Sequence, residues 1–567
     1  MQSLTQGLLG YWPLAGDARD HSGKGHHGRP HGVDFAAAGP GGAPGTAGRF
    51  DGIDDCIEVA DHPDLALGQA PFSLTAWVRV EQDHTDVIGD IAGKYDPSSR
   101  RGFNFYLSTS SPGYNSHSDS RHLHFGIDNA MESAWEDCGV LEPTNTYVSS
   151  LTVFDGQLYA AQADATGDGT RACHVWRYGG GQEWEDCGRV SPDLGQRSAY
   201  ALIVHRGSLY CGTGRQDWVV AGPDHCSFVH MYRYLGGTEW EDLGQVGRNY
   251  RILSLASFGG ELYCGTDVCH PQIHPDSCRV FRHRGGQEWE DCGRPGDQRH
   301  VFSLMVHDGQ LYAGCFGPIH RYLGGTEWEY LGKPFNNTQV HCLQVYRGDL
   351  WTGTWPQGHI ARYTHGQTWE DMGLVGDTRP SLRERINEIN DLTVHNGSLF
   401  AGVIPKGEVY RYQGRGQWEM MRRLLTNPEY DPGHVDSWAR VPCITAFGGM
   451  LYAGTGTCRG YAEEKPLPEA GRVYRTRIGQ AVAHERDLGD GWHQVAAVRE
   501  EDRLCLYLDG RRVCQSAPFA GACYDLQTPA PLHLGFGAVD YFSGEMAEVR
   551  LYGRALSPEE VAALARR

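Results

Sequence analysis

The sequence lacks the long apolar run that a membrane span requires. Its longest apolar stretches, such as ALIV and LASF, are far shorter than the roughly 20 residues needed to cross a bilayer. The start of the chain, MQSLTQGLLGYW, has no basic segment followed by an apolar one, so it shows no export signal. We therefore expect a chain without membrane spans.

The sequence also contains fewer cationic than anionic residues. Lys and Arg number 50 against 70 Asp and Glu, which gives a formal net charge of -20. No Lys/Arg-rich stretch offsets this deficit locally, and phosphate backbones are bound mainly by clustered cations. Nucleic acid is therefore excluded as an expected partner.

Several familiar catalytic frameworks are missing. The sequence has no Gly-x-Ser-x-Gly elbow, no phosphate-binding loop and no His-Glu-x-x-His pair. Acyl transfer through such an elbow, nucleotide chemistry and zincin-type proteolysis therefore have no support.

What the sequence does contain is repetition, because two short motifs each occur seven times in the middle of the 567-residue chain. One period spans about 47 residues and consists of four short apolar or aromatic segments separated by turns, which predicts a seven-bladed β-propeller. The Gly-x-Leu-aromatic motif begins at Gly156, Gly207, Gly260, Gly309, Gly348, Gly397 and Gly449. A Trp usually followed by Glu lies at Trp135, Trp184, Trp240, Trp289, Trp328, Trp369 and Trp418.

The two ends of the repeat region are expected to meet. The first Trp motif, at Trp135, precedes the first Gly motif, whereas the last blade ends near VYRT at 473–476 with no Trp motif after it. Pairing these ends completes the seventh blade and leaves no open edge strand. The turns before each Trp, such as LGGTEW, resemble degenerate Asp boxes of sialidase-like propellers, and the blades resemble kelch repeats. Because the Ser and Asp of an Asp box are missing, this resemblance implies the blade shape and not sialidase chemistry.

The repeats also account for many of the 17 cysteines. Cys138, Cys187 and Cys292 share one blade position with Leu and Met residues, and Cys211 and Cys264 share another with Ala. We interpret these thiols as small core hydrophobes.

The ends of the chain carry a different pattern. GLLGYWPLAGDARDHSGKGHHG at 7–28, GRFDGIDDCIEV at 48–59 and FSLTAWVRV at 72–80 resemble the first half of a laminin-G-like, concanavalin A-type jelly roll. GWHQVAAV at 491–498, LYLDGRRV at 506–513 and YFSGEMAEVRLYGRALSPEEV at 541–561 resemble its second half.

This resemblance implies an all-β chain in which a seven-bladed β-propeller is inserted into a concanavalin A-like jelly roll, a β-sandwich. The expected limits are 1–130 for the first half of the jelly roll, 131–479 for the propeller and 480–567 for the second half. By family resemblance, the protein is expected to be extracellular or at the cell surface.

Function in a propeller is expected at the mouth of the central channel, where the loops enter the innermost strands. Aligning the seven inner strands places Tyr147, Ser198, Arg251, His300, Gln339, Glu388 and Arg440 in one polar ring, with Tyr200, His341 and Asn390 two positions deeper. We predict a ligand site formed by Arg251, Arg440, Gln339, Tyr200, His341 and Asn390. His300, Glu388 and Tyr147 are the candidates for proton transfer if the site is catalytic. The alternative is that strand entries are polar because they meet water.

The sequence predicts metal sites at two places. Cys269, His270, His274 and Cys278 offer two thiols and two imidazoles within ten residues, a set that could bind Zn²⁺. A disulfide between Cys269 and Cys278, or free thiols, is the competing interpretation. In the jelly roll, the carboxylates of DGIDD at 51–55 and of Asp540 could bind a structural Ca²⁺, and a plain turn explains them equally well.

Three functions fit these patterns. The first is a glycan-recognition protein with a carbohydrate-binding jelly roll and a ligand-binding propeller mouth. The second is an enzyme, a polysaccharide lyase or glycoside hydrolase, with its active site at that mouth. The third is a propeller scaffold for protein partners. Because propellers host all three, the fold alone does not separate them.

Overall fold

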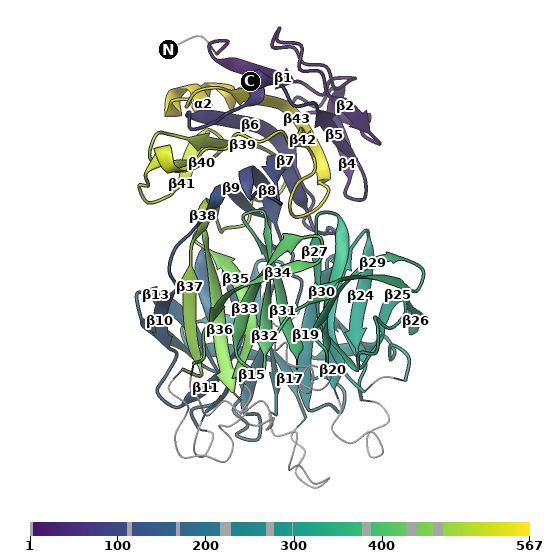
Figure 1. Cartoon of the computed structure of the whole chain (residues 1–567). Coiled ribbons are helices and arrows are strands. Elements are labelled where there is room, and N and C mark those ends of the chain that lie inside the picture. The colour runs from purple at the N-terminus through teal and green to yellow at the C-terminus, as the bar shows by residue number, and fades with distance from the viewer. Residues whose placement is uncertain are drawn as a thin grey trace.

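The computed structural model describes residues 4–109, 116–165, 170–215, 228–267, 277–297, 299–376, 387–426, 439–457 and 469–566. The chain is all-β, and its two parts are stacked, with a β-sandwich above a β-propeller in Figure 1. Among the described residues, the single α-helix is α2, Pro558–Leu564, which begins at a capping box formed by Ser557 and Glu560. No helix of the described ranges has the length and apolar character needed to span a bilayer.

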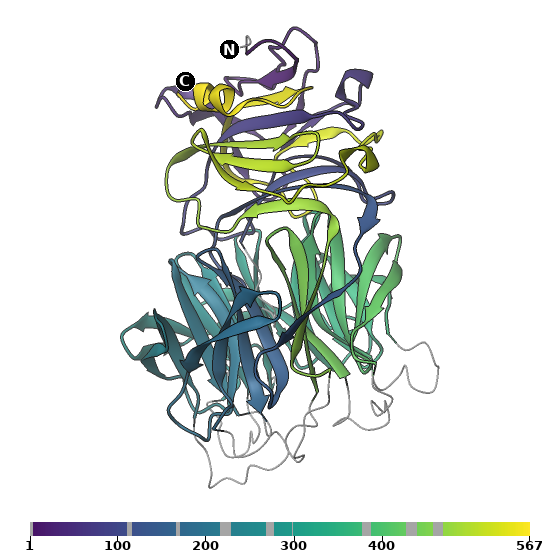
Figure 2. The ribbon, with the colours of Figure 1, turned by 90° about the vertical axis from the view of Figure 1, so that its left-hand side faces the viewer.

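The sandwich consists of two antiparallel sheets. The outer sheet contains β1 (Leu8–Trp12), β3 (Asp34–Ala38), β4 (Pro44–Asp51), β6 (Phe72–Arg79), β39 (Trp492–Arg499), β40 (Leu504–Leu508), β41 (Arg511–Gln515) and β43 (Ser543–Tyr552). The inner sheet, next to the propeller, contains β2 (Arg29–His31), β5 (Cys56–Val59), β7 (Gly89–Asp96), β8 (Arg101–Ser108), β9 (His122–Glu132), β38 (Ile478–His484) and β42 (Leu532–Leu534). Figure 2 shows these layers from the side.

Both sheets combine strands from the two ends of the chain. In the outer sheet, β6 lies between β39 and β43, and in the inner sheet β9 pairs with β38. The apolar faces of the two sheets form one core, in which Phe72 and Phe125 meet Val495 and Leu551. Neither end of the chain therefore supplies a complete sandwich core. β9 ends at Glu132 and β38 begins at Ile478, close to the predicted domain limits, which themselves stay predictions.

The propeller has seven four-stranded blades among the described residues. Blades 1 to 3 are β11–β14 (Asn145–Phe154, Gln157–Ala165, His174–Gly180, Glu183–Arg189), β15–β18 (Ser198–His205, Ser208–Gly214, His230–Gly236, Glu239–Gln245) and β19–β22 (Arg251–Phe258, Glu261–Asp267, Val280–Gly285, Glu288–Asp291).

Blades 4 to 6 are β23–β26 (Val301–His307, Gln310–Cys315, Ile319–Gly324, Glu327–Tyr330), β27–β30 (Gln339–Tyr346, Asp349–Trp355, His359–His365, Thr368–Leu374) and β31–β34 (Glu388–His395, Ser398–Ile404, Glu408–Gly414, Gln417–Arg423). Blade 7 is β35 (Ala439–Phe447), β36 (Met450–Thr457), β37 (Arg472–Thr476) and, from before blade 1, β10 (Glu136–Val140).

The repeated Trp joins neighbouring blades. In six of the seven repeats, its indole Nε1 donates a hydrogen bond of 2.8–2.9 Å to a backbone carbonyl in the outer part of the preceding blade. A Phe cannot make this bond and a Tyr would place its donor elsewhere, which explains why Trp recurs. The pairs are Trp184 with Cys138, Trp240 with Cys187, Trp289 with Leu243, Trp328 with Cys292, Trp369 with Leu331 and Trp418 with Met372.

The Arg and Glu of the repeat form a cross-strand ion pair within each blade. In blade 3, for example, Arg282 in β21 pairs with Glu290 in β22, and their Nη2 and Oε2 atoms are 2.6 Å apart. In blade 7 the same pair is made by residues from opposite ends of the propeller, because Arg475 in β37 meets Glu136 in β10 at 2.7 Å. The predicted ring closure by pairing of these ends is therefore confirmed.

The thiols named from the repeat are core residues, as predicted. Cys138, Cys187, Cys211, Cys264 and Cys292 are each at most 2% exposed. Burial raises the pKa of all five thiols, so they remain protonated and apolar.

The inner sheet of the sandwich closes one face of the propeller by binding the turns of the Gly-x-Leu-aromatic hairpins. The carboxylate of Asp119 accepts from the Arg206 amide of blade 2, and Asp86 Oδ1 accepts from the Asp308 amide of blade 4 at 2.9 Å. Glu485 Oε1 accepts from the Gly448 amide of blade 7 at 2.6 Å. The central channel is therefore covered at this end, where a cavity of about 50 Å³ lies between Tyr106 and His124 of the sandwich and the propeller strands.

Candidate functional site at the propeller mouth opposite the sandwich

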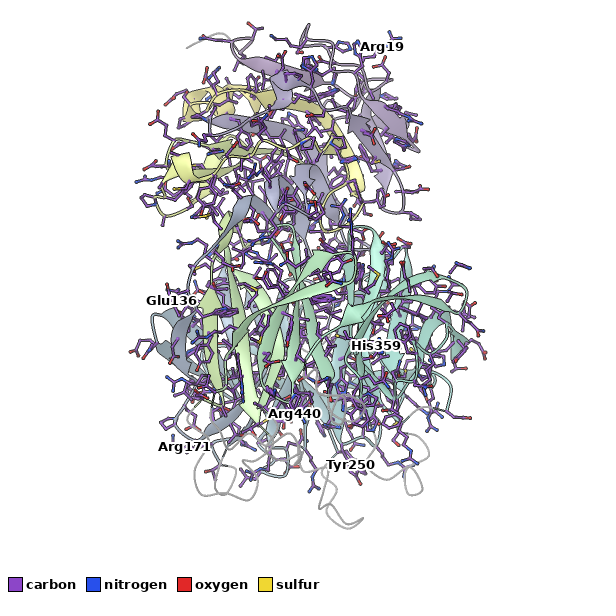
Figure 3. All side chains as sticks on the ribbon, viewed as in Figure 1. Arg19, Glu136, Arg171, Tyr250, His359 and Arg440 are labelled. Atoms are coloured by element: carbon purple, nitrogen blue, oxygen red, sulfur yellow. The ribbon has the colours of Figure 1, made fainter. Side chains whose placement is uncertain are left out.

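The face of the propeller that points away from the sandwich carries the entries of the inner strands. Figure 3 places Arg440 and Tyr250 at this end of the propeller, opposite the sandwich. The predicted ring residues lie there because each sits at or next to the first residue of an inner strand: Arg251 begins β19, Gln339 begins β27, Glu388 begins β31, and His300 precedes β23. The backbone therefore places side chains of successive blades around one opening.

One group of the mouth is centred on Asp267, the last residue of β20, which is fully buried. Arg251 donates from Nε to Asp267 Oδ2 at 2.6 Å, and His300 Nδ1 lies 3.5 Å from the same oxygen. Burial alone would raise the pKa of Asp267, but the charges of Arg251 and His300 outweigh it and hold the pKa below its usual value. The carboxylate therefore stays ionised and fixes the Arg251 guanidinium.

The second group is centred on Glu388, which is 4% exposed. His341 Nε2 lies 3.4 Å from Glu388 Oε1, and Arg440 Nη1 lies 3.7 Å from it. Asn390 Nδ2 donates to the same oxygen. Gln339 Oε1 is 2.5 Å from His341 Nε2, so this imidazole faces both an amide and a carboxylate.

Burial lowers the pKa of His341 to about 4. The imidazole is therefore neutral near pH 7, and a neutral imidazole can accept a proton from a ligand or donate one through its N–H. Its Nδ1 atom is buried and has no hydrogen-bond partner among the described residues. His341 is accordingly the group of this ring whose protonation state the environment fixes most clearly.

An aromatic stack connects the two groups. The ring of Phe302 lies between the imidazoles of His300 and His341, with centroid distances of 4.9 and 4.2 Å. Phe302 also belongs to an apolar cluster from four blades, together with Tyr147, Ala163, Tyr200 and Leu253. The Arg251 guanidinium lies over the Tyr200 ring at 5.7 Å. The mouth thus has an apolar floor and polar walls.

Accessible groups concentrate on the side of blades 4 and 5. The His300 side chain is 18% exposed, and Phe316, whose ring lies 5.5 Å from that of His300, is 36% exposed. Gln339 and Trp355 are half-buried, and they face each other in the β27 and β28 ladder. Among the described residues, these groups could offer a ligand an imidazole, an amide and two aromatic rings.

The structure brings most of the predicted residues together but distributes their roles differently. Tyr147 and Tyr200 are 2% and 3% exposed and belong to the apolar floor. Catalysis by Tyr147 stays a prediction. Asp267, which is not among the predicted site residues, is the anchor of Arg251. Its place at the end of the second strand, directly across from a ring position, is the signal that would have revealed it.

The predicted zinc ligands lie largely outside the described residues, namely Cys269, His270 and His274. Cys278 is described and is 1% exposed, with its Sγ against the backbone carbonyl of Arg299. The Asp51, Asp54 and Asp55 carboxylates lie together, and Asp51 Oδ1 accepts from the Ile53 amide at 2.8 Å while Asp55 Oδ2 accepts from the Asp51 amide at 3.0 Å. Those hydrogen bonds are what a turn requires. Asp540 does not join that group.

Residues 471–562 match the family model of the concanavalin A-like lectin/glucanases superfamily, in its laminin G form. No curated protein matches the chain. The chain is similar in structure to the extracellular domain of a protein described as a hybrid two component system from B. thetaiotaomicron, with 13% identity and a TM-score of 0.39, covering 56% of this chain and 39% of that one.

Two further solved structures are propeller proteins. The WD40 β-propeller domain of Doa1 is 10% identical with a TM-score of 0.39, covering 61% of this chain and 96% of that one. A Trypanosoma rangeli sialidase in complex with the inhibitor DANA is 11% identical with a TM-score of 0.32, covering 74% of this chain and 94% of that one. At these values the likenesses carry no information on activity.

Proposed function

We propose that this protein recognises carbohydrate and that the mouth of the propeller opposite the sandwich binds the saccharide. The observation that carries the proposal is the arrangement of Asp267, Arg251, Glu388 and Arg440 around the Phe302 stack. Among the described residues, two guanidinium groups pair with two carboxylates, so this part of the mouth offers both donors and acceptors. Sugar hydroxyls both donate and accept hydrogen bonds, and their ring faces pack on aromatic side chains.

The pairing of these charges also indicates which class of saccharide the mouth would bind. Arg251 is already bound by a fully buried carboxylate at 2.6 Å, and Arg440 faces Glu388. An anionic sugar would have to compete with these carboxylates and approach their charge. We therefore expect neutral, polyhydroxylated saccharides to bind more tightly than uronates. The match of residues 471–562 to a lectin and glucanase superfamily supports a role with carbohydrate but does not locate the site.

The test is a binding screen against neutral and acidic polysaccharides, followed by calorimetry with the best ligand. Phe316→Ala and Gln339→Ala remove accessible groups of the mouth without cutting into its buried ion pairs. Each should weaken binding by about 1 kcal/mol, roughly fivefold, because one ring contact or one hydrogen bond is lost. Tyr330→Ala removes a ring that is 45% exposed on an outer strand and serves as the matched control.

Unchanged affinity in both mouth variants, with binding retained by the full chain, would place the saccharide elsewhere. The outer sheet of the sandwich would then be the next candidate, since the inner sheet is covered by the propeller. Failure of every saccharide to bind would favour the protein-scaffold alternative.

A second candidate function is a polysaccharide lyase or glycoside hydrolase at the same mouth. It is favoured by one observation, the neutral His341 placed 3.4 Å from the Glu388 carboxylate, since such a pair can move a proton. Hydrolysis would release reducing ends, and elimination would create an absorbing unsaturated uronate. His341→Gln should abolish either signal while leaving saccharide affinity within about threefold of the parent protein, because the loss concerns proton transfer more than association. Equal turnover in His341→Gln would refute this role.

A further inference from the structure

A second cluster of titratable groups lies far from the mouth, between the sandwich and the propeller. Asp86 and Asp540 come from the sandwich, and His307 and Asp308 come from the end of β23 and the hairpin turn of blade 4. His307 Nδ1 lies 3.3 Å from Asp308 Oδ1, 3.5 Å from Asp540 Oδ2 and 3.9 Å from Asp86 Oδ1. One nitrogen is thus surrounded by three carboxylates from two parts of the fold.

The atoms that face one another in this cluster lack hydrogen bonds. Asp86 Oδ1 accepts from two backbone amides and Asp540 Oδ1 accepts from one, but the other carboxylate oxygens, Asp86 Oδ2 and Asp540 Oδ2, accept none. His307 Nδ1 and Asp308 Oδ1 also have no hydrogen-bond partner. The side chains of Asp86, Asp540 and His307 are 4%, 0% and 6% exposed. Unpartnered polar atoms this deeply buried are costly unless something binds them.

The charge of the cluster is equally unbalanced. Within the described ranges, His307 is the one cationic side chain in an ion pair with these three carboxylates. Asp349 and Asp51 lie close enough to add repulsion. With the carboxylates ionised, the cluster carries about three negative charges around a neutral imidazole, and an imidazolium would leave about two. A divalent cation would reduce this to about one while satisfying the buried oxygens.

We propose that Asp86, His307, Asp308 and Asp540 bind a divalent transition-metal ion, such as Zn²⁺ or Mn²⁺, that fastens the sandwich to blade 4 of the propeller. One imidazole with several carboxylates is a donor set that suits such ions better than Mg²⁺ or Ca²⁺, which prefer oxygen alone. Two ligands of a tetrahedral zinc ion at about 2.0–2.1 Å lie about 3.3–3.4 Å apart, close to the two shorter spacings around Nδ1. Asp86, His307 and Asp308 offer ligand atoms that all lie within 4.8 Å of one another.

The position of the cluster is consistent with both entry and function of an ion. The Asp308 side chain is 34% exposed, so an ion can reach the site from solvent without opening the fold. Bound there, it would connect residues more than 200 positions apart in the sequence, Asp86 with His307 and Asp308 with Asp540. The ion would therefore stabilise the docking of the two parts and would not touch a saccharide at the distant mouth.

The experiment uses the full chain with Cys269→Ala and His274→Ala, so that the separate Cys-His loop cannot supply the metal. Elemental analysis after purification without chelator should find about one Zn or Mn per chain. Removal of the metal should lower the melting temperature, and Zn²⁺ or Mn²⁺ should restore it, while Ca²⁺ and Mg²⁺ should restore it less. In the same background, His307→Gln and Asp540→Asn should each reduce bound metal to below about a tenth of an equivalent.

Asp119→Asn is the matched control, because Asp119 forms the comparable contact with His205 between the two parts but has its oxygens satisfied by donors. It should keep the metal and the sensitivity to chelator even though it weakens the fold. The proposal is overturned if the Cys269→Ala, His274→Ala protein contains no metal, takes up none from Zn²⁺ or Mn²⁺ solutions, and melts at one temperature with and without chelator. This outcome would indicate that the carboxylates instead hold His307 as an imidazolium. The measurement needs no substitution within the cluster, so it does not depend on whether such variants fold.

Discussion

Replacement of Asp119 tests whether the contacts between the sandwich and the propeller stabilise the whole chain. Asp119 is 4% exposed and its carboxylate accepts from the Arg206 amide at 2.9 and 3.1 Å and from Ser257 Oγ at 3.0 Å. His205 Nδ1 lies 3.2 Å from it. Asp119→Ala removes all of these interactions and leaves their donors without a partner. Breaking a buried, hydrogen-bonded ion pair costs about 3–5 kcal/mol, which is the loss expected in the free energy of unfolding.

The matched control concerns the same Arg206. Its side chain pairs with Asp83 at 2.9 Å, but both side chains are more than half exposed, at 53% and 57%. Because exposed ion pairs contribute little, Asp83→Ala should cost less than about 1 kcal/mol. Asp119→Asn keeps an acceptor and loses the charge. Its loss of unfolding free energy should therefore lie between those of Asp83→Ala and Asp119→Ala. Urea unfolding followed by tryptophan fluorescence would measure all three.

The pH dependence of the stability provides a second test of the contact between Asp119 and His205. Burial would raise the pKa of Asp119, but the hydrogen bonds and charge of His205 and the Arg206 amide hold the pKa below its usual value. A carboxyl whose pKa is lower in the folded chain stabilises it above the pKa of the unfolded chain, near 3.9, and loses that effect as the pH falls through the folded value. The difference between parent and Asp119→Asn should therefore shrink below about pH 4. A loss no larger than that of Asp83→Ala at pH 7 would refute the reasoning.

Three other expectations follow from the fold. Trp289→Phe should lower the free energy of unfolding by about 1–2 kcal/mol, because the Leu243 carbonyl loses its indole donor. Equal stability of the variant and the parent protein would show that only the packing of the ring matters. Burial raises the pKa of Glu485 to about 8, so between pH 4.5 and 8 the folded chain holds a proton that the unfolded chain releases, and stability should fall as the pH rises across this window. Glu485→Gln should flatten that fall in denaturant titrations, and an unchanged slope would contradict the assignment. A fragment of residues 134–478 should unfold cooperatively because it contains both β10 and β37. The fragments 141–478, which lacks β10, and 1–129, which lacks half of the sandwich core, should not unfold cooperatively. A cooperatively folded 1–129 fragment would contradict the shared core.

Much of the fold could be predicted from the sequence because its determinants are local and repeated. The four-strand period, the recurring Trp and the Arg-Glu pair each describe contacts that recur from blade to blade, so the count of motifs gave the number of blades. The ring closure by β10 followed from one Trp motif being left over at the start of the chain. The inner-strand alignment likewise placed Arg251, Glu388 and Arg440 at one opening.

The remainder was decided by contacts between residues far apart in the sequence, which no local pattern encodes. The pairing with Asp267 made Arg251, a predicted ligand-binding residue, one half of an ion pair. The docking of Asp86, Asp119 and Glu485 onto the hairpin turns determined which face of the propeller is closed. The sequence by itself determined a propeller with seven blades, since strand period and turn chemistry act within a few residues. The divided sandwich was implied by the resemblance of the two ends of the chain to a laminin-G-like domain. Only the tertiary structure decided which mouth the sandwich covers and that His307 meets Asp540, because burial and ion pairing depend on which distant residues the fold brings together.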